Sequence, residues 1–555
     1  MTASPDTLDA LDAPVLAPAP PTAPGADRGP GLRARLAAIL APLAGAARVA
    51  SRHADALLAL VLSLATGAVH AAGVFGFPSL ADDEGTYVAQ AAAIRGGELT
   101  HYTYWYDHPP LGWIQIGLLD WLPQRLFAGA HPVAASRLIM VLASTVGAAL
   151  LYVLARRVGL ARAFAALAVV LAFVSPLSVV LQRQVYLDNV ATPWVLLSLV
   201  LALDPRRRLA MHLGAGAAFA VAVLTKETSV LLLPVAAWML LRSTDARTRV
   251  FSVAGWISGA SVVLFYPLTA VLRGELVPGR GHVSLWDAVM FQIVERTGTG
   301  AMWDPHSLSR LALDSWLTYD SWIVIFGLAA APVCLAVRAL RPVGLAVALL
   351  TLVALKPSGY LPVMYVIVAL PFLGLAAAGA AEAIWHLVHR LAVRVAPRLR
   401  ATTGVMIAVR RVLAGAAALA VAGGLAWVWT PTLTSVLTTP ANNFRYDAEA
   451  WVAANVPASS VVLADDVTWV ALVDDQVVPR DRALWFYKLD TDPAVRAQLP
   501  GGWHDVDYVV ATDQLRNAIA GDPTLRESAA ALKESDLVAV FGDGEGRVEI
   551  RRVNR

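Results

Sequence analysis

The chain contains little charge, little lysine and a single cysteine, and each shortage narrows the classes of protein to which it can belong. Charged residues make up 15% of its 555 residues, whereas soluble domains carry about 25%. Hydrophobic residues reach 57% and the mean hydropathy is +0.59, which excludes a soluble globular protein and predicts several membrane spans. Because Cys334 is the only cysteine, no disulfide can form within the chain.

Long apolar segments recur along the chain, and roughly 20 such residues are needed to cross a bilayer. The sequence predicts about eleven membrane helices, in the ranges 55–77, 133–155, 161–181, 188–203, 209–225, 228–241, 250–272, 318–337, 343–356, 360–382 and 411–430. Basic clusters precede the first span and follow the second, fourth, sixth, eighth and tenth. By the positive-inside rule these clusters are cytoplasmic, which places the N-terminus inside and the C-terminus outside. The strong preference for Arg over Lys is typical of a high-GC bacterial genome, so we expect the bacterial cytoplasmic membrane.

The predicted spans divide the chain into three parts. Residues 1–50 are rich in Ala, Pro and Asp, then Arg, and predict a disordered cytoplasmic segment with a basic amphipathic stretch. Residues 51–432 form the predicted membrane domain, with a polar outer loop at 78–132 and an aromatic, Gly-rich outer loop at 273–317 that we interpret as a substrate gate. Over 433–555, short apolar runs alternate with helical stretches, which predicts a small extracytoplasmic α/β domain.

Three acidic residues, Asp82, Asp83 and Glu84, follow directly after the first apolar span. The segment EGTYVAQAAAIRGG has a helical pattern that ends at Gly-Gly, and the helix dipole stabilises negative charge at a helix start. One interpretation is therefore a capped helix beside the membrane. The other is a general base or metal ligand in an outward-facing cavity, because partial desolvation gives a carboxylate a pKa suited to proton abstraction.

Further charged residues lie at the predicted outer ends of the spans. The first outer loop closes on YDHPPLGW, where two prolines hold Asp107 and His108 in a rigid turn. The others are Arg137, Arg183, Asp188, Lys226, Glu227 and Lys356. Such residues can be snorkelling anchors, but the positive-inside rule predicts few cations on this face. Their presence beside acids favours a site for an anionic headgroup such as a lipid phosphate.

The segment DDEGTYVAQAAAIRGGELTHYTYWYDHPPLGWIQ resembles the first outer loop of the GT-C glycosyltransferases of family 39, which include protein O-mannosyltransferases and the aminoarabinose transferases of lipid A. Asp83 and Glu84 match the family's Asp-Glu pair after the first span, and His108 begins a match to its His-Pro-Pro-Leu motif. Arg137, Lys226 and the stretch KPSGYLPVMYVIVALP are similar to further family positions. The similarity is strong over residues 55–240 and weak in the C-terminal part.

The resemblance implies a GT-C-like enzyme that moves a monosaccharide from a polyprenyl-phosphate donor to an acceptor hydroxyl on the outer membrane face. It implies Asp83 as the general base and Glu84 as a residue that positions the donor or acceptor. It implies that His108, Arg137 and Lys226, with Arg183 or Lys356, hold the phosphate leaving group. Together with the other residues singled out above, the predicted substrate-binding set is made up of Asp107, His108, Arg137, Arg183, Asp188, Lys226, Lys356 and Tyr360. With one base and no carboxylate nucleophile, the transfer would be inverting. No cofactor is implied, and dependence on a divalent metal stays open.

Two other functions fit a membrane protein of this composition. A transporter or lipid flippase places ionisable groups near the bilayer midplane and often has inverted repeats, whereas the charges here collect on one face and no internal repeat is evident. A receptor-like protein leaves the cluster of acids and cations unexplained. The glycosyltransferase is our prediction, with the transporter or flippase as the alternative. The expected partners are the bilayer, the polyprenyl-phosphate sugar and a glycan, lipid or protein acceptor, without nucleic acid.

Overall fold

The computed structural model describes residues 53–395 and 403–554, so the predicted N-terminal segment 1–50 lies outside the described residues. Within the described part, six helical segments are long and apolar enough to cross a membrane. They are His53–Ala71, Pro132–Arg157, Arg249–Leu272, Leu308–Ala336, Val363–Leu391 and Val412–Asn455. The membrane-protein character predicted from the composition is therefore confirmed.

Several of these segments are assembled from more than one helix, and shorter helices occupy the remaining predicted ranges. The longer ones comprise α4 (Pro132–Arg157), α10 (Arg249–Val263), α11 (Phe265–Leu272), α13 (Leu308–Ala336), η3 (Val363–Tyr365), α15 (Val366–Val395) and α16 (Thr403–Thr438). The shorter ones are α5 (Arg162–Val174), α6 (Pro176–Leu181), α7 (Leu187–Ala202), α8 (Leu209–Thr225), η1 (Glu227–Leu232), α9 (Leu233–Arg242) and α14 (Arg341–Ala354). Because the shorter helices fall below the usual length of a membrane span, the predicted number of spans stays a prediction.

Polar residues interrupt two of the helical ranges without leaving the backbone unpaired. Ser175 separates α5 from α6, and its hydroxyl accepts a hydrogen bond from the Ser178 N–H at 3.2 Å. Asp320 has non-helical angles inside α13 (φ −159°, ψ 92°), and its carboxylate accepts from the Trp322 N–H at 3.0 Å. Each side chain thus caps the helix that follows, as a membrane environment requires of free N–H groups.

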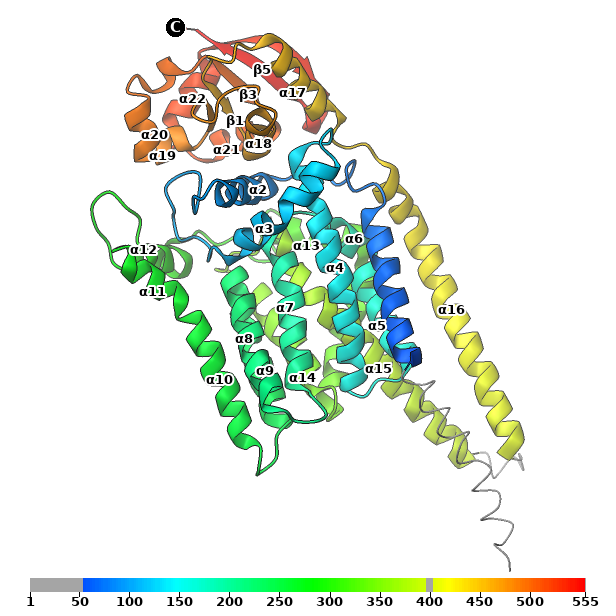
Figure 1. The fold of residues 1–555 in the computed structure, drawn as a ribbon. Coiled ribbons are helices and arrows are strands. Elements are labelled where there is room, and N and C mark those ends of the chain that lie inside the picture. Colours follow the sequence, from blue (N-terminus) through cyan, green and yellow to red (C-terminus); the bar gives the residue numbers. More distant parts are fainter. Residues whose placement is uncertain (1–52, 396–402, 555) are drawn as a thin grey trace, which may run out of the picture. The chain divides into compact units, whose positions relative to one another are not determined.

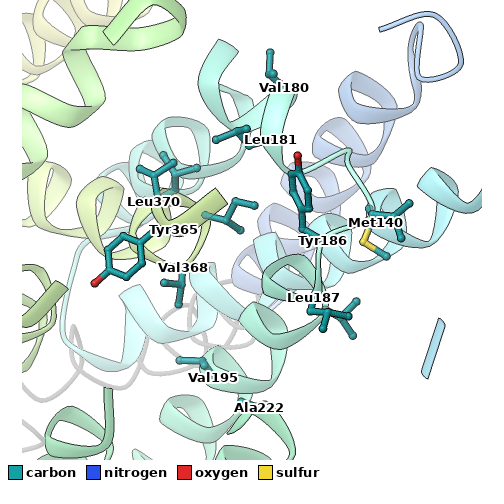
Figure 2. Packing of buried hydrophobic residues seen from close by; sticks show 14 of the residues in the cluster. Met140, Val180, Leu181, Tyr186, Leu187, Val195, Ala222, Tyr365, Val368 and Leu370 are labelled. Carbon is teal, nitrogen blue, oxygen red and sulfur yellow. The ribbon is translucent and has the colours of Figure 1, made fainter. Parts of the chain in front are cut away.

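The buried core of the membrane helices includes residues of α4, α6, α7, α8 and α15 (Figure 1). Figure 2 shows buried side chains of these helices, among them Met140, Leu181, Leu187, Ala222 and Leu370. Small residues allow the helices to approach closely, as is usual in membrane proteins. At Gly374 of α15, for example, a Cβ would lie only 2.9 Å from the carbonyl oxygen of Ala168 in α5.

The predicted first outer loop contains two helices, α2 (Asp82–Arg95) and α3 (Leu111–Leu126). The predicted helix after the three acids is present and ends before Gly97, which has a positive φ of 83°. Arg95 in the last turn of α2 pairs with the buried carboxylate of Asp120 in α3. The predicted second outer loop contains a short helix α12 (Leu285–Met290) and the π-helical turn η2 (Phe291–Glu295).

The C-terminal part contains a five-stranded sheet of strand order β2-β1-β3-β5-β4. The strands are β1 (Val462–Ala464), β2 (Ala483–Trp485), β3 (Tyr508–Ala511), β4 (Ser535–Phe541) and β5 (Val548–Val553). Strand β1 is parallel to its neighbours β2 and β3, whereas β5 is antiparallel to β3 and β4. The intervening helices are α17 (Asn443–Asn455), α18 (Asp466–Asp474), α19 (Lys488–Thr491), α20 (Pro493–Gln498), η5 (Gly502–Asp505), α21 (Asp513–Gly521), α22 (Arg526–Lys533) and η6 (Gly544–Gly546).

Helix α18 of this C-terminal domain packs directly on the first turn of α2 (Figure 1). The approach depends on Gly85, because a Cβ at this position would overlap the backbone of Asp466 and Val467. The Thr86 hydroxyl donates a hydrogen bond to the Asp466 carboxylate across the same contact. The turn that carries the three acids is therefore enclosed between the membrane domain and the C-terminal domain.

Candidate active site

Glu84 and Arg137 form a fully buried ion pair behind the first turn of α2. Arg137 Nε donates to Glu84 Oε2 at 2.8 Å and Nη2 donates to Oε1 at 2.6 Å, and neither side chain is exposed to solvent. The Glu84 carboxylate also accepts from the backbone N–H groups of Ala81 at 3.1 Å and Val185 at 2.9 Å. Glu84 thereby joins α2 to α4 and to the turn that precedes α7.

The two arginines of the predicted substrate-binding set, Arg137 and Arg183, bind backbone carbonyl groups of the protein. Arg137 Nη1 donates to the carbonyl oxygen of Pro78 at 2.9 Å. Arg183 Nη2 donates to those of Val69 at 2.8 Å and Ala72 at 2.7 Å. Because the last carbonyls of a helix lack partners within it, Arg183 completes the C-terminal end of the first membrane helix, and Arg137 fixes the segment after it.

Asp83 differs from Glu84 because no hydrogen bond or ion pair is formed to its carboxylate by any residue in the described part of the chain. Burial raises the pKa of Asp83, and the positive charges of Lys226 and His108 oppose that rise. An unpaired, partly desolvated carboxylate near cations has the properties of a general base, since it is free to accept a proton from a bound hydroxyl.

His108, Lys226 and Glu227 form one hydrogen-bonded group near Asp83. Glu227 Oε2 lies 3.0 Å from His108 Nδ1, and Lys226 Nζ lies 3.0 Å from His108 Nε2. An ammonium group can only donate, so His108 Nε2 accepts from Lys226, and Nδ1–H donates to Glu227. The group therefore holds a fixed ammonium at the junction of the first outer loop with α8.

The structure brings together five residues of the predicted site. The Lys226 ammonium is attracted electrostatically by Glu227 and by three predicted residues, Asp188, Asp83 and Asp107. Asp188 is buried in the first turn of α7, at 5% exposure, whereas Asp107 is exposed on the turn before α3. The five residues are Asp83, Asp107, His108, Asp188 and Lys226.

Two residues outside the predicted set also contribute to this cluster. Glu227 follows Lys226 directly in the sequence, but its contact with His108, 119 positions away, depends on how the helices pack. Arg296 comes from the second outer loop, and its positive charge acts on Asp83. Its guanidinium lies 3.5 Å over the ring of Tyr360, which connects one further predicted residue to the site. No local pattern in the sequence marks Arg296.

Lys356 lies apart from the His108 group on an exposed turn. Within the described residues, no hydrogen bond or ion pair is formed by its ammonium, and its backbone carbonyl accepts from the Gly359 N–H at 2.9 Å. The same turn pairs with the second outer loop, because the Thr299 N–H donates to the Gly359 carbonyl oxygen at 2.9 Å. The structure does not place Lys356 in contact with the other predicted residues.

Asp82, the first of the three acids, interacts with the C-terminal domain. The Asp466 N–H lies 3.4 Å from Asp82 Oδ1, and Asp466 Oδ2 accepts from the Tyr487 hydroxyl at 2.9 Å. Burial, followed by the neighbouring negative charge of Asp466, raises the pKa of Asp82. Burial raises the pKa of Asp466 to about 7. The two carboxyl groups therefore belong to the contact between domains, while Asp83 belongs to the His108 group.

No group of three or more His, Cys, Asp or Glu side chains is arranged to hold a metal ion among residues 53–395 and 403–554. The acids are instead spread over the Arg137 pair, the His108 group and the contact with α18.

Comparisons with known proteins identify the architecture. Residues 107–271 match the family model described as dolichyl-phosphate-mannose-protein mannosyltransferase. The structure is similar to ArnT from Cupriavidus metallidurans in the apo state, with a TM-score of 0.53, 16% sequence identity, and coverage of 91% of this chain and 98% of ArnT. This chain has the GT-C fold. The GT-C-like architecture expected from the sequence is thus confirmed.

Two further solved structures share the GT-C fold with this chain. ArnT bound to undecaprenyl phosphate gives a TM-score of 0.51 at 16% identity, covering 88% of this chain and 97% of ArnT. The Archaeoglobus fulgidus oligosaccharyltransferase AglB, in complex with an inhibitory peptide and a dolichol-phosphate, gives 0.50 at 12% identity, covering 90% of this chain and 74% of AglB. Among curated proteins, no sequence matches the chain significantly.

Proposed function

We propose that this protein is a membrane glycosyltransferase that moves a monosaccharide from a polyprenyl phosphate to an acceptor hydroxyl on the outer face of the membrane. The observation that carries the proposal is that a free carboxylate and a fixed ammonium lie near each other at the predicted first outer loop. Asp83 has an unpaired carboxylate, and Lys226 holds a fixed positive charge within its electrostatic influence. The matched family model and the two fold relatives with bound polyprenyl-type phosphates support this donor class.

The reaction needs a base at the acceptor and a cation at the leaving group. Asp83 takes the proton from the acceptor hydroxyl, and the hydroxyl oxygen of the acceptor attacks the anomeric carbon of the donor sugar. The bond between that carbon and the phosphate oxygen breaks, and the polyprenyl phosphate leaves with the bonding electron pair. A single displacement of this kind inverts the anomeric carbon, in the same way as inverting glycoside chemistry.

Lys226 is proposed to bind the departing phosphate, and His108 to hold its ammonium in place. The Lys226 ammonium stabilises the negative charge that develops on the phosphate oxygen as the bond breaks. Glu227 accepts from His108 Nδ1 and so fixes the orientation of the imidazole ring. Lys226 Nζ lies 3.0 Å from His108 Nε2. When a bound phosphate attracts the ammonium, Lys226 therefore remains beside His108.

The contacts described above change the roles proposed for three residues. Glu84, Arg137 and Arg183 were expected near the donor or acceptor, but their polar groups bind one another and the backbone. We therefore propose that they are positioning residues that hold the α2 turn against the membrane domain. Asp188 and Asp107 are proposed to contact sugar hydroxyls, and Tyr360 to hold Arg296 in place.

The test begins with the lipid that accumulates when the gene is deleted. Extracted lipids of the deletion strain are analysed by mass spectrometry, and we expect a polyprenyl-phosphate sugar to increase. The strain is then complemented with wild type, Asp83→Asn or Asp82→Asn. Wild type and Asp82→Asn should restore the normal lipid level, whereas Asp83→Asn should lose about 10²–10⁴-fold in rate. Restoration by Asp83→Asn would exclude this residue as the base.

A second measurement separates a transferase from the flippase alternative. The extracted lipid is incubated with purified full-length protein in detergent, where no membrane separates two compartments. A transferase still releases polyprenyl phosphate when an extract of the deletion strain supplies the acceptor, whereas a flippase leaves the lipid chemically unchanged. Unchanged lipid in this assay, or no accumulation in the deletion strain, would contradict the proposed function.

A further inference from the structure

Lys488 of the C-terminal domain is a buried lysine without an acidic partner in contact. It begins the short helix α19, and 7% of the residue is exposed. No hydrogen bond or ion pair is formed by its ammonium within the described residues. The group instead lies near four aromatic rings, with its nitrogen 4.9 Å from the ring centroid of Trp105 and 5.4, 5.5 and 5.9 Å from those of Tyr487, Tyr102 and Trp485.

This environment is unfavourable for a residue whose only role is structural. Burial of an ammonium without an anion in contact is strongly disfavoured, and nearby aromatic faces offset only part of that penalty. Burial accordingly lowers the pKa of Lys488, and Asp492 and Asp466 counteract this from beyond ion-pair distance. A methionine would fill the same space without a buried charge, so a ligand for the ammonium explains the lysine better than packing does.

A cavity of about 440 Å³ lies beside this aromatic group. Tyr102 and Asp492 border both the cavity and the Lys488 surroundings. Its other polar lining residues are Glu98, His101, Thr103, Arg480, Asp481 and Gln498. Ligand pockets commonly have volumes of 300–1,000 Å³, so this cavity can accommodate a small oligosaccharide. Flat aromatic faces with carboxylate and amide groups around them are suited to sugar rings, whose C–H faces are apolar and whose hydroxyls donate and accept hydrogen bonds.

The Lys488 surroundings are linked to the turn of the proposed base by one shared charge and one hydrogen bond. Asp107 acts electrostatically on both the Lys488 ammonium and the Asp83 carboxylate. Asp466, which also attracts Lys488, accepts a hydrogen bond from Thr86 in the turn that bears Asp83. In the sequence, Trp105 lies between Asp83 and Lys488, and the residue is 39% exposed. A molecule bound against Trp105 and Lys488 would therefore lie within the electrostatic influence of Asp107, which also acts on Asp83.

We propose that the seam between residues 98–107 and the C-terminal domain is the acceptor site, and that it takes a carbohydrate whose hydroxyls bind Lys488 and whose ring stacks on Trp105. This inference rests on the proposed function and specifies its acceptor class. A phosphate-bearing acceptor fits less well, because Asp107, Asp466 and Asp492 would repel it. A peptide acceptor lacks the flat apolar ring face that Trp105 would hold.

The test measures glycan binding by purified full-length protein in detergent. The probe is an array of oligosaccharides of hexoses, pentoses and amino sugars, with Ser- and Thr-rich peptides on the same surface. Wild type should bind a subset of the oligosaccharides, and Lys488→Met and Trp105→Leu should bind that subset about tenfold or more weakly, as expected for loss of a charge-assisted hydrogen bond or a stacking contact. Lys533→Met removes an exposed lysine of the same domain and should bind as wild type does.

Thermal melting of the same preparations separates binding from folding. Because Lys488→Met removes a buried charge, we expect a melting temperature equal to or above that of wild type, whereas a structural lysine would give a lower one. Binding to peptides alone, binding to neither class, or unchanged glycan binding by both variants would overturn the proposal. Binding of undecaprenyl phosphate is measured in parallel, and its absence in wild type would count against the proposed function independently of the array.

Discussion

Arg137 donates hydrogen bonds to both carboxylate oxygens of Glu84, from Nε at 2.8 Å and from Nη2 at 2.6 Å, and neither side chain is exposed. Removing one partner of such a pair leaves a buried charge without compensation and typically reduces stability by about 3–5 kcal/mol. We expect Arg137→Met and Glu84→Leu each to lower the melting temperature strongly. The double variant should be more stable than either single variant, because it buries no unpaired charge. Thermal melting of the purified proteins checks this, and additive losses would contradict a direct pair.

The Lys226 ammonium is the cation proposed to bind the donor phosphate. Loss of a hydrogen bond to a charged group typically weakens binding by about 1.5–3 kcal/mol, roughly 10–150-fold. We therefore expect Lys226→Met to raise the dissociation constant for undecaprenyl phosphate by that factor. Lys356→Met is the matched control, since its ammonium lies on an exposed turn away from His108. An equal loss of affinity for undecaprenyl phosphate in the control would show that Lys356 also binds the phosphate.

Gly85 is the point at which α2 meets the backbone of α18. A side chain there would overlap Asp466 and Val467, so Gly85→Val should separate the C-terminal domain from the α2 turn. We expect faster cleavage of the chain between residues 438 and 443 in limited proteolysis, together with reduced sugar transfer. Gly129→Ala provides the control, because a Cβ at Gly129 meets open space. Unchanged proteolysis of Gly85→Val would show that the contact does not hold the domains together.

The raised pKa of Asp466 makes the same contact sensitive to pH. An unfolded Asp has a pKa of about 3.9, whereas burial raises that of folded Asp466 to about 7. The folded state therefore binds the proton more tightly, and the contribution to stability is present below pH 4 and lost as pH rises to about 7. Asp466→Asn stays neutral, so its melting temperature should exceed that of wild type increasingly between pH 4 and 7.

The control for this pH dependence is Asp475→Asn, which changes an exposed acid just after the same helix. Its melting temperature should follow that of wild type at every pH. A constant difference between wild type and Asp466→Asn over pH 4–8 would contradict a proton held at the contact between the domains.

The hydropathy pattern located the helices well because burial in a bilayer constrains composition over many consecutive residues. Helix α4 at Pro132–Arg157 matches the predicted range 133–155, and α2 begins and ends where the acids and the Gly-Gly pair indicated. The break at Asp320 was not predicted, because a single acid in an apolar segment carries no information about its backbone angles. The helix that follows this break ends at Ala336 and agrees with the predicted range 318–337, whereas the helical residues from Leu308 to the break lie mostly in the segment predicted as a loop.

The proposed site was predictable to the extent that its residues adjoin those helix ends that the sequence predicts to be outside. Asp83, His108 and Lys226 share that position, and the structure brings them together. The sequence did not show that Arg137 forms an ion pair with Glu84. These residues are 53 positions apart, and such a pairing depends on how the helices pack. The same limitation applies to Lys488, whose aromatic neighbours come from segments almost 400 positions apart.

The docking of α18 on the α2 turn has a consequence for how the protein matures. Thr86 and Asp466 are separated by 380 positions, so the ribosome completes nearly the whole chain before the second partner exists. During most of synthesis and membrane insertion, the turn that bears Asp83 therefore has no contact with α18. A nascent chain, or one truncated before residue 466, therefore lacks this contact, and the surroundings of the proposed base are completed only after the C-terminal part has been synthesised.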